Sequence, residues 1–314
     1  MEKAIEVLEG AFRELAKKTV DMPLRSFVRS KNPTGVLVSM PSSLPDALGM
    51  KVVTVFPDNP KNHNGLRASQ STIFLNDKGT GRLAAILEAD YITILRTGAV
   101  GGVATKYLSR KDSSIAGILG SGPQAESQLE AILVARPGVK KAKVYSRDPA
   151  HRNSYAKKMS EKLGIKVVAL DSAREAVANS DIVSTATSST KPVFFGEWLE
   201  PGMHVNAIGS GLPERREIDE ESLLKPDKVI AEYAPPTLVE SGDLIVPLDK
   251  GVVKKESVFY ADLGEIVLGT RPGRENENEI TLFKSVGLAI EDVAIAKFVY
   301  DAAQARDLGQ TITL

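Results

Sequence analysis

Short apolar strands alternate with helical segments from residue 115 to residue 185 of this chain. The first strand, residues 115–119, runs directly into a glycine-rich turn and a helix over residues 124–134. This alternation is typical of parallel strands covered by helices, so it predicts an α/β fold with a Rossmann-type doubly wound sheet. Later segments of the same pattern are expected at 143–146, 152–163, 166–170, 173–178 and 182–185, with further strands at 204–208, 228–231 and 280–283.

The turn reads Gly120-Ser121-Gly122-Pro123-Gln124-Ala125 and matches the pattern G-x-G-x-x-A. Gly120 permits a tight turn, Gly122 lets a pyrophosphate approach the backbone, and Ala125 allows the helix to pack closely on the strand. The N-terminus of the helix adds N–H groups and a positive dipole. A glycine-rich turn without a ligand is the alternative, and the strand before it together with the helix after it favours a dinucleotide site.

The end of the second strand bears on which dinucleotide is bound. A carboxylate there would bond the two ribose hydroxyls of NAD, whereas this chain has Ser146 followed by Arg147. A hydroxyl and a guanidinium suit a 2′-phosphate, because Arg binds phosphate through two parallel contacts. We therefore expect NADP(H) to be favoured over NAD(H). In the competing interpretation Asp148 binds the ribose and Arg147 is solvated.

A second, α+β region surrounds this domain in the sequence. A helix ending near Lys18 precedes β-rich runs at 36–40, 50–56, 71–75 and 83–87, with a hairpin turn at 76–81, and these predict an antiparallel sheet. Residues 91–107 form a helix that we expect to bridge two domains, and the last helix, 288–306, is expected to return to the first. The predicted domains are 1–111 plus 287–314 for substrate binding and dimerisation, and 112–286 for the dinucleotide.

Composition excludes several classes of partner. Forty Lys and Arg balance forty Asp and Glu, which removes the positive field that a nucleic acid or an anionic membrane would require. There is no cysteine, and the three histidines are not at ligand spacing, so no metal site is expected. The N-terminal residues form a helical pattern instead of a signal segment, and no apolar run is long enough for a membrane span. We expect a cytoplasmic protein whose ligand is small.

Two basic side chains stand in unusual surroundings. Lys51 shares the apolar face of its strand with Val53 and Val55, and a lysine so placed requires an anion or a ligand unless it is only an edge-strand charge. Arg96 lies among small residues on the 91–107 helix, where a carboxylate or phosphate could approach it. Each signal is modest alone.

Together with other motifs, these residues resemble the ornithine cyclodeaminase/mu-crystallin family, which includes archaeal alanine dehydrogenase and ketimine reductases. The resemblance covers nearly the whole chain. The motifs that carry it, in order, are Met22-Pro23-Leu24-Arg25, the Lys51 strand with Phe56-Pro57-Asp58-Asn59, Arg96-Thr97-Gly98-Ala99, the turn at 120–125, Asn206-Ala207-Ile208-Gly209, and Ser285-Val286-Gly287-Leu288-Ala289 with Asp292.

The resemblance implies roles for individual residues. Arg25, Lys51 and Arg96 correspond to positions that bind the substrate carboxylate, Lys51 also to the catalytic acid or base, and Val286 to a substrate contact. Arg96 is also expected to approach the cofactor. The other cofactor positions implied by the resemblance are Thr97, Pro123, Gln124, Ser146, Thr185, Ile208 and Ser285. For Thr185 and Ser285, capping of a strand end is the structural alternative.

Departures from the family narrow the expected substrate. Ornithine cyclodeaminases have carboxylates where this chain has Val38 and Gly211, so the distal ammonium of ornithine would be desolvated without a partner. Alanine dehydrogenase of the family has lysine at the position of Arg25 and also has the acid missing at Gly211. Ser210 with Gly211 is more similar to the mu-crystallin branch, whose members reduce cyclic imino acids with NADPH.

The resemblance therefore implies an NAD(P)H-dependent reductase of small cyclic imino acids, or in reverse an amino-acid dehydrogenase, that acts as a homodimer. Two alternatives are a cyclodeaminase-type lyase with bound NAD and a non-catalytic NADPH-binding protein like mu-crystallin. The convergence of three cations argues against simple storage of a cofactor.

Overall fold

The computed structural model describes residues 1–63 and 65–312, and these form two compact units. One unit comprises Met1–Ile5 and Thr97–Gly287, and the other comprises Glu6–Arg96 and Leu288–Leu314 up to the last described residue. Residues 313 and 314, the end of the predicted first domain, lie outside the described residues. Helices α1 (Glu2–Ala16) and α3 (Asp90–Leu108) each contribute residues to both units.

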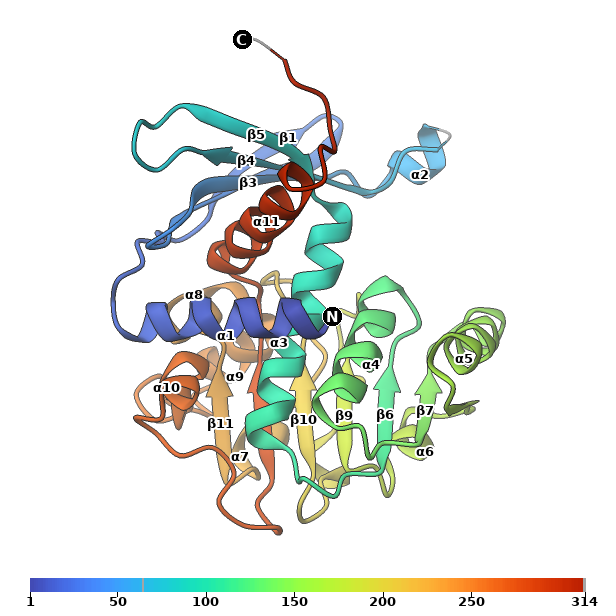
Figure 1. Cartoon of the computed structure of the whole chain (residues 1–314). Coiled ribbons are helices and arrows are strands. Elements are labelled where there is room, and N and C mark those ends of the chain that lie inside the picture. The colour runs from blue at the N-terminus through green and yellow to red at the C-terminus, as the bar shows by residue number, and fades with distance from the viewer. Residues whose placement is uncertain (64, 313–314) are drawn as a thin grey trace. The chain divides into compact units, whose positions relative to one another are not determined.

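The larger unit is built on a parallel sheet, which Figure 1 shows with helices packed along it. Its strands lie in the order β12-β11-β13-β10-β9-β6-β7-β8. This confirms the predicted Rossmann-type sheet. The strands are β6 (Ile115–Leu119), β7 (Lys141–Tyr145), β8 (Lys166–Ala169), β9 (Ile182–Thr185), β10 (His204–Ala207), β11 (Lys228–Ala231), β12 (Ala261–Asp262) and β13 (Thr281–Lys284).

Helices cover both faces of this sheet because alternate strand residues point to opposite sides. Ile118 joins one apolar cluster with Leu129 and Met159, whereas Leu119 joins another with Phe194 and Leu282. The helical elements of this unit are α4 (Pro123–Ala135), α5 (Pro149–Leu163), α6 (Ala173–Val177), the short η1 (Gly196–Trp198), α7 (Glu221–Leu224), α8 (Ala234–Glu240), α9 (Gly242–Asp249) and α10 (Leu263–Leu268).

The strand order places a switch point at β6. The chain proceeds from β6 to β7 and β8 on one side, and then returns to add β9 and β10 on the other. In open α/β sheets the crevice at the carboxyl ends of such strands is the usual ligand site. The last strand, β13, is inserted between β10 and β11, an order that the sequence did not reveal.

The smaller unit contains an antiparallel sheet in the order β1-β2-β3-β4-β5, visible above α11 in Figure 1. Helix α11 (Ala289–Gln304) packs on β2, β3 and β4. The strands are β1 (Ser26–Lys31), β2 (Thr34–Ser43), β3 (Leu48–Val55), β4 (Ser69–Asn76) and β5 (Leu83–Glu88), and the short helix α2 (Asn59–Asn62) follows β3. The expected antiparallel sheet is thus confirmed, with the addition of β1.

The strand register of this sheet determines the surroundings of Lys51. Met40 and Ile73 lie directly across from it on the two neighbouring strands, and all three side chains are buried. Because paired residues of adjacent strands share a face, Lys51 belongs to the covered face of the sheet. In the described part of the chain, no helix is long and apolar enough to span a membrane.

Candidate functional site

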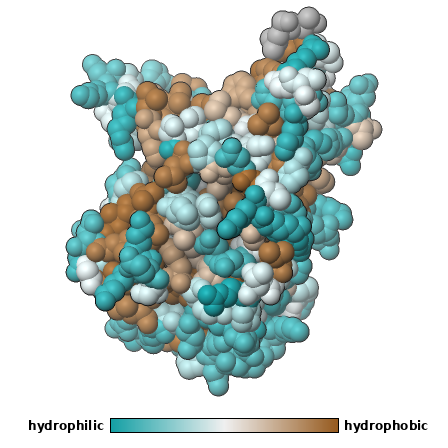
Figure 2. Space-filling model, turned by 90° about the vertical axis from the view of Figure 1, so that its left-hand side faces the viewer, coloured by the Kyte–Doolittle hydropathy of each residue, from teal (hydrophilic) through white to brown (hydrophobic). Residues whose placement is uncertain are grey.

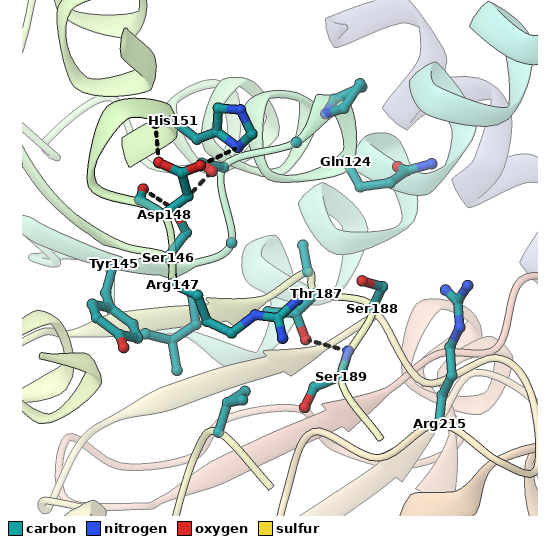
Figure 3. A pocket seen from close by; sticks show the side chains of 17 residues that line it. Gln124, Tyr145, Ser146, Arg147, Asp148, His151, Thr187, Ser188, Ser189 and Arg215 are labelled. Atoms are coloured by element: carbon teal, nitrogen blue, oxygen red, sulfur yellow. Dashed lines mark hydrogen bonds and ion pairs between the residues drawn. The ribbon is translucent and has the colours of Figure 1, made fainter. Parts of the chain in front are cut away.

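A pocket of about 810 Å³ opens at the carboxyl ends of β6 and β9 in the larger unit (Figure 3). The glycine turn forms one wall of this pocket. The lining residues that had been predicted as cofactor contacts are Gly120, Gly122, Pro123, Gln124, Ser146 and Arg147. The strand order and the turn therefore bring these six positions together around one cavity.

Backbone geometry explains the small residues of the turn. Gly120 has a φ of +120°, and a Cβ there would lie 2.4 Å from the carbonyl oxygen of Ala186, so only glycine fits. Gly122 precedes α4, and a Cβ there would meet nothing within 4 Å. Ala125 does not line the pocket; it is buried in the core with Ile118. Gly120 thus shapes the turn, whereas Gly122 leaves space on the pocket side.

The pocket fits a dinucleotide on two observations. The start of α4, a helix of 13 residues, lines the cavity with Gly122, Pro123 and Gln124, and the positive end of a helix dipole suits an anionic phosphate. The Oε1 atom of Gln124 is buried without a hydrogen-bond partner among the described residues, so a ligand donor would satisfy it. When bound there, a reduced nicotinamide dinucleotide supplies a hydride.

Arg147 and Asp148, which follow β7, differ in their contacts with the rest of the protein. In Figure 3 the Arg147 side chain extends toward Thr187, and it has no hydrogen bond or ion pair to another of the described residues. Asp148 caps α5, since its Oδ1 accepts hydrogen bonds from the N–H groups of Ala150 (2.8 Å) and His151 (3.3 Å). These backbone bonds lower the pKa of Asp148. Its carboxylate thus has a structural role that the competing interpretation of Asp148 did not include.

Other lining residues were not predicted. A polar run, Thr187-Ser188-Ser189, follows β9, and Arg215 approaches from the loop after β10 (Figure 3). The polar run could have been found, because it directly follows a strand next to β6. The sequence around Arg215 contains no pattern that predicts a binding residue, because only the conformation of its loop brings the side chain to the cavity.

Thr185 does not line this pocket, and its hydroxyl bonds a buried carboxylate. The hydroxyl donates to Glu217 at 2.6 Å, and the same carboxylate accepts from the N–H groups of Thr187 (2.5 Å) and Gly209 (2.6 Å). Burial, followed by the nearby carboxylate of Asp243, raises the pKa of Glu217. Glu217 therefore joins the loops that follow β9 and β10.

Ser285 is arranged in the same way around a second buried glutamate. Its hydroxyl donates to Glu232 at 2.5 Å, and Glu232 also accepts from the N–H groups of Val286 (3.1 Å) and Gly287 (2.7 Å). Both Thr185 and Ser285 thus bond a buried glutamate at the end of a strand, and their cofactor roles remain predictions. Sequence reasoning identified neither Glu217 nor Glu232.

The remaining predicted cofactor positions of this unit are buried. Ile208 directly follows β10, and Thr97 lies on α3, where its carbonyl accepts a hydrogen bond from Gln128. Neither residue lines the pocket described above. Their predicted roles, and the substrate role of Val286, remain predictions.

The smaller unit holds the predicted cations. Lys51 Nζ lies 2.6 Å from Asp292 Oδ2, and Arg96 Nε donates to Asp292 Oδ1 at 3.0 Å. Arg96 also pairs with Glu291 at 2.9 Å. Arg25 is near enough to Lys51 to disfavour its charged form. Asp292, which the family motif includes, is the anion that the buried lysine requires.

The environment of Lys51 suits proton transfer. Its pKa is lowered to about 8, first by burial and then by Arg96 and Arg25, while Asp292 opposes the shift. A lysine with a pKa close to neutral can both hold and release a proton under ordinary conditions. Among the described residues, no three His, Asp or Glu side chains gather to hold a metal ion.

The strand order, the glycine turn and the pocket define a dinucleotide-binding protein of the Rossmann class. Residues 1–307 match the ornithine cyclodeaminase/mu-crystallin family, and the chain belongs to this family. A relative, the delta(1)-pyrroline-2-carboxylate reductase of Bacillus cereus, is 38% identical over 314 residues, which cover 99% of this chain and 95% of that protein.

Solved structures show the same fold. The delta(1)-pyrroline-2-carboxylate reductase of Thermococcus litoralis, in complex with NADH and L-proline, has a TM-score of 0.94 and 44% identity, covering 99% of this chain and 96% of that chain. An archaeal alanine dehydrogenase dimer with bound NAD has a TM-score of 0.93 and 37% identity, covering 100% of this chain and 95% of that chain. The resemblance extends through both units.

Proposed function

We propose that this protein is an NAD(P)H-dependent oxidoreductase that reduces the C=N bond of a small cyclic imino acid, such as pyrroline-2-carboxylate. One observation carries the proposal: a buried lysine with a lowered pKa stands beside Arg96 and Asp292 on an apolar sheet face. The names of the B. cereus and T. litoralis relatives support the class of substrate.

The residues of the smaller unit have separable tasks in this reaction. Arg25 and Arg96 bind the substrate carboxylate and fix the face that the imine carbon presents. The Lys51 ammonium gives a proton to the imine nitrogen, and the carbon receives the hydride as the C=N bond becomes a single bond. Solvent then returns a proton to Lys51. The overall change is imine plus NAD(P)H plus a proton to amine plus NAD(P)⁺.

Apolar surroundings favour a hydrocarbon ring over a second charged group. Val38 and Met40 are buried in one cluster with Ala289 on the Lys51 face of the sheet. A distal ammonium placed against this cluster would lose its hydration without a counter-ion. Gly211 likewise offers no carboxylate for such an ammonium, and a Cβ there would make a close contact of 3.1 Å with the backbone oxygen of Val286. These features support a cyclic imino acid over ornithine.

The test is a substrate panel monitored by NAD(P)H absorbance at 340 nm. We expect turnover with pyrroline-2-carboxylate and with its six-membered homologue, and little with pyruvate plus ammonia. Formation of proline and ammonia from ornithine without net consumption of NAD would instead support a cyclodeaminase. Tight cofactor binding with no turnover of any imino acid would support a non-catalytic binding protein and refute the proposal.

We infer a preference for NADPH over NADH. Arg147 lines the pocket without an intramolecular partner among the described residues, while the neighbouring carboxylate of Asp148 caps α5. A guanidinium available at this strand end suits a 2′-phosphate. The structure of the T. litoralis relative contains NADH. The test is therefore to compare the reaction rates of this protein with NADPH and with NADH at equal concentration.

We further propose a cytoplasmic homodimer that pairs through residues 1–111 and 287–314, with residues 112–286 as the cofactor domain. Apolar side chains stay exposed on the antiparallel sheet, among them Val28 and Ile86, and Figure 2 shows apolar patches reaching the surface of the face it views. A related alanine dehydrogenase is a dimer. Sedimentation velocity should give twice the chain mass of 33.7 kDa, and a monomer alone would contradict this.

A further inference from the structure

Two adjacent carboxylates occupy the first turn of α11. Glu291 and Asp292 are both fully buried, a state that ionised side chains rarely adopt unless they are paired. The N-terminus of this 16-residue helix favours negative charge. Because α11 packs on β2, β3 and β4, it brings these two acids to the sheet face that carries Lys51.

Asp292 bonds two cations from different elements at the same time. Its Oδ2 lies 2.6 Å from Lys51 Nζ on β3, and its Oδ1 accepts from Arg96 Nε on α3 at 3.0 Å. Glu291 Oε2 accepts a hydrogen bond from Arg96 Nη1 at 2.9 Å. The two acids therefore differ in what they contact: Asp292 bridges Lys51 and Arg96, and Glu291 pairs with Arg96.

Loss of Asp292 would change the electrostatic surroundings of Lys51. The Asp292 carboxylate forms an ion pair with the Lys51 ammonium, whereas Arg96 and Arg25 both disfavour the charged form of the lysine. Without Asp292, Lys51 would keep these two repulsive neighbours and lose the attractive one.

We propose that Asp292 is a positioning residue, which holds the Lys51 ammonium and the Arg96 guanidinium together so that proton donor and carboxylate binder stay in place. The inference rests on the proposed function, because it concerns the same reduction. Lys51 is faced by Asp292 from α11, by Arg96 from α3 and by Arg25 from the segment before β1. Asp292 is the group among them that stabilises the protonated lysine, whereas the two arginines oppose it.

The experiment compares two neighbouring neutral substitutions, Asp292→Asn and Glu291→Gln, in the full-length protein. The pH dependence of kcat/KM for pyrroline-2-carboxylate should show a fall near pH 8 in the unmodified protein, where Lys51 loses its proton. In Asp292→Asn this fall should move to lower pH, and kcat at pH 7 should drop by about tenfold or more. Glu291→Gln should raise KM and leave the position of the fall unchanged.

A purely structural role would affect the two variants alike, since both remove a buried charge from one helical turn. An unmoved profile in Asp292→Asn, or equal shifts in both variants, would overturn the proposal. Should Asp292→Asn fail to fold, Asp292→Glu decides: a retained carboxylate should keep the fall near pH 8, and a shift to lower pH would count against the proposal.

A second measurement does not depend on turnover. The Lys51 resonance in protein labelled with ¹³Cε-lysine, assigned by its disappearance in Lys51→Met, should titrate near pH 8 and move to lower pH in Asp292→Asn. If no imino acid is reduced but this titration behaves as expected, the proposed function fails and the link between Asp292 and Lys51 stands. If turnover is found but the titration is unchanged in Asp292→Asn, the inference alone fails.

Discussion

Replacing Arg147 by glutamine should change the choice of cofactor more than the rate of the reaction. The side chain lines the pocket at the end of β7 and has no partner among the described residues, so its removal breaks no internal contact. A hydrogen bond to a charged group contributes about 1.5–3 kcal/mol, which corresponds to roughly a 10- to 150-fold loss of kcat/KM for NADPH. The value for NADH should stay within about threefold, because that cofactor has no 2′-phosphate.

The matched control is Arg215→Gln, the same substitution at another arginine of the same pocket. Arg215 approaches from the loop after β10, so its loss should weaken NADPH and NADH to similar degrees. Initial rates with each cofactor at several ionic strengths complete the assay, since salt should narrow the NADPH advantage of the unmodified protein. An equal decline for both cofactors in Arg147→Gln would refute the assignment of Arg147 to the phosphate.

Three other changes have distinct expected results. Lys51→Met should lower kcat by about 100-fold or more, with the cofactor Kd from fluorescence titration unchanged. His204 has its pKa lowered to about 3 by burial, so only the unfolded chain takes up a proton as the pH falls below 6.5. Urea titrations should show about 2 kcal/mol of stability lost from pH 7 to pH 5, and a flatter dependence in His204→Gln. Glu217→Gln should cost about 1–3 kcal/mol, seen as a lower Tm, because the amide NH₂ would replace one of the two oxygens and would then face the N–H group of either Thr187 or Gly209.

The sequence predicted the parallel sheet well because its strands are short, apolar and separated by regular helices. The strands at 182–185 and 228–231 have the predicted bounds. Some individual elements were not predicted. One is β1 (Ser26–Lys31), an exposed edge strand without apolar alternation. Helices α8 and α9 contain Pro235, Pro236 and Pro247, which read as helix breakers in a sequence.

The sequence identified several residues of the site, but it did not show which residues they contact. Burial of Lys51 followed from strand alternation, and the structure confirms it. Its partner Asp292 lies 241 positions away in the chain, and no local pattern relates the two. The hydroxyls of Thr185 and Ser285 were found as strand-end groups, but their acceptors Glu217 and Glu232 come from loops and other strands that only the folded chain brings near.

Glu217 and Glu232 also restrict how an elongated anion can lie across the sheet. Four backbone N–H groups after β9, β10 and β13 donate hydrogen bonds to these carboxylates, and so they are not available to a phosphate oxygen. Among the described residues, no side chain caps the start of α4, which lies at the wall of the pocket. A phosphate of a long ligand would therefore bind at the start of α4 and not at the ends of β10 and β13, which would fix the direction in which the ligand lies across the sheet.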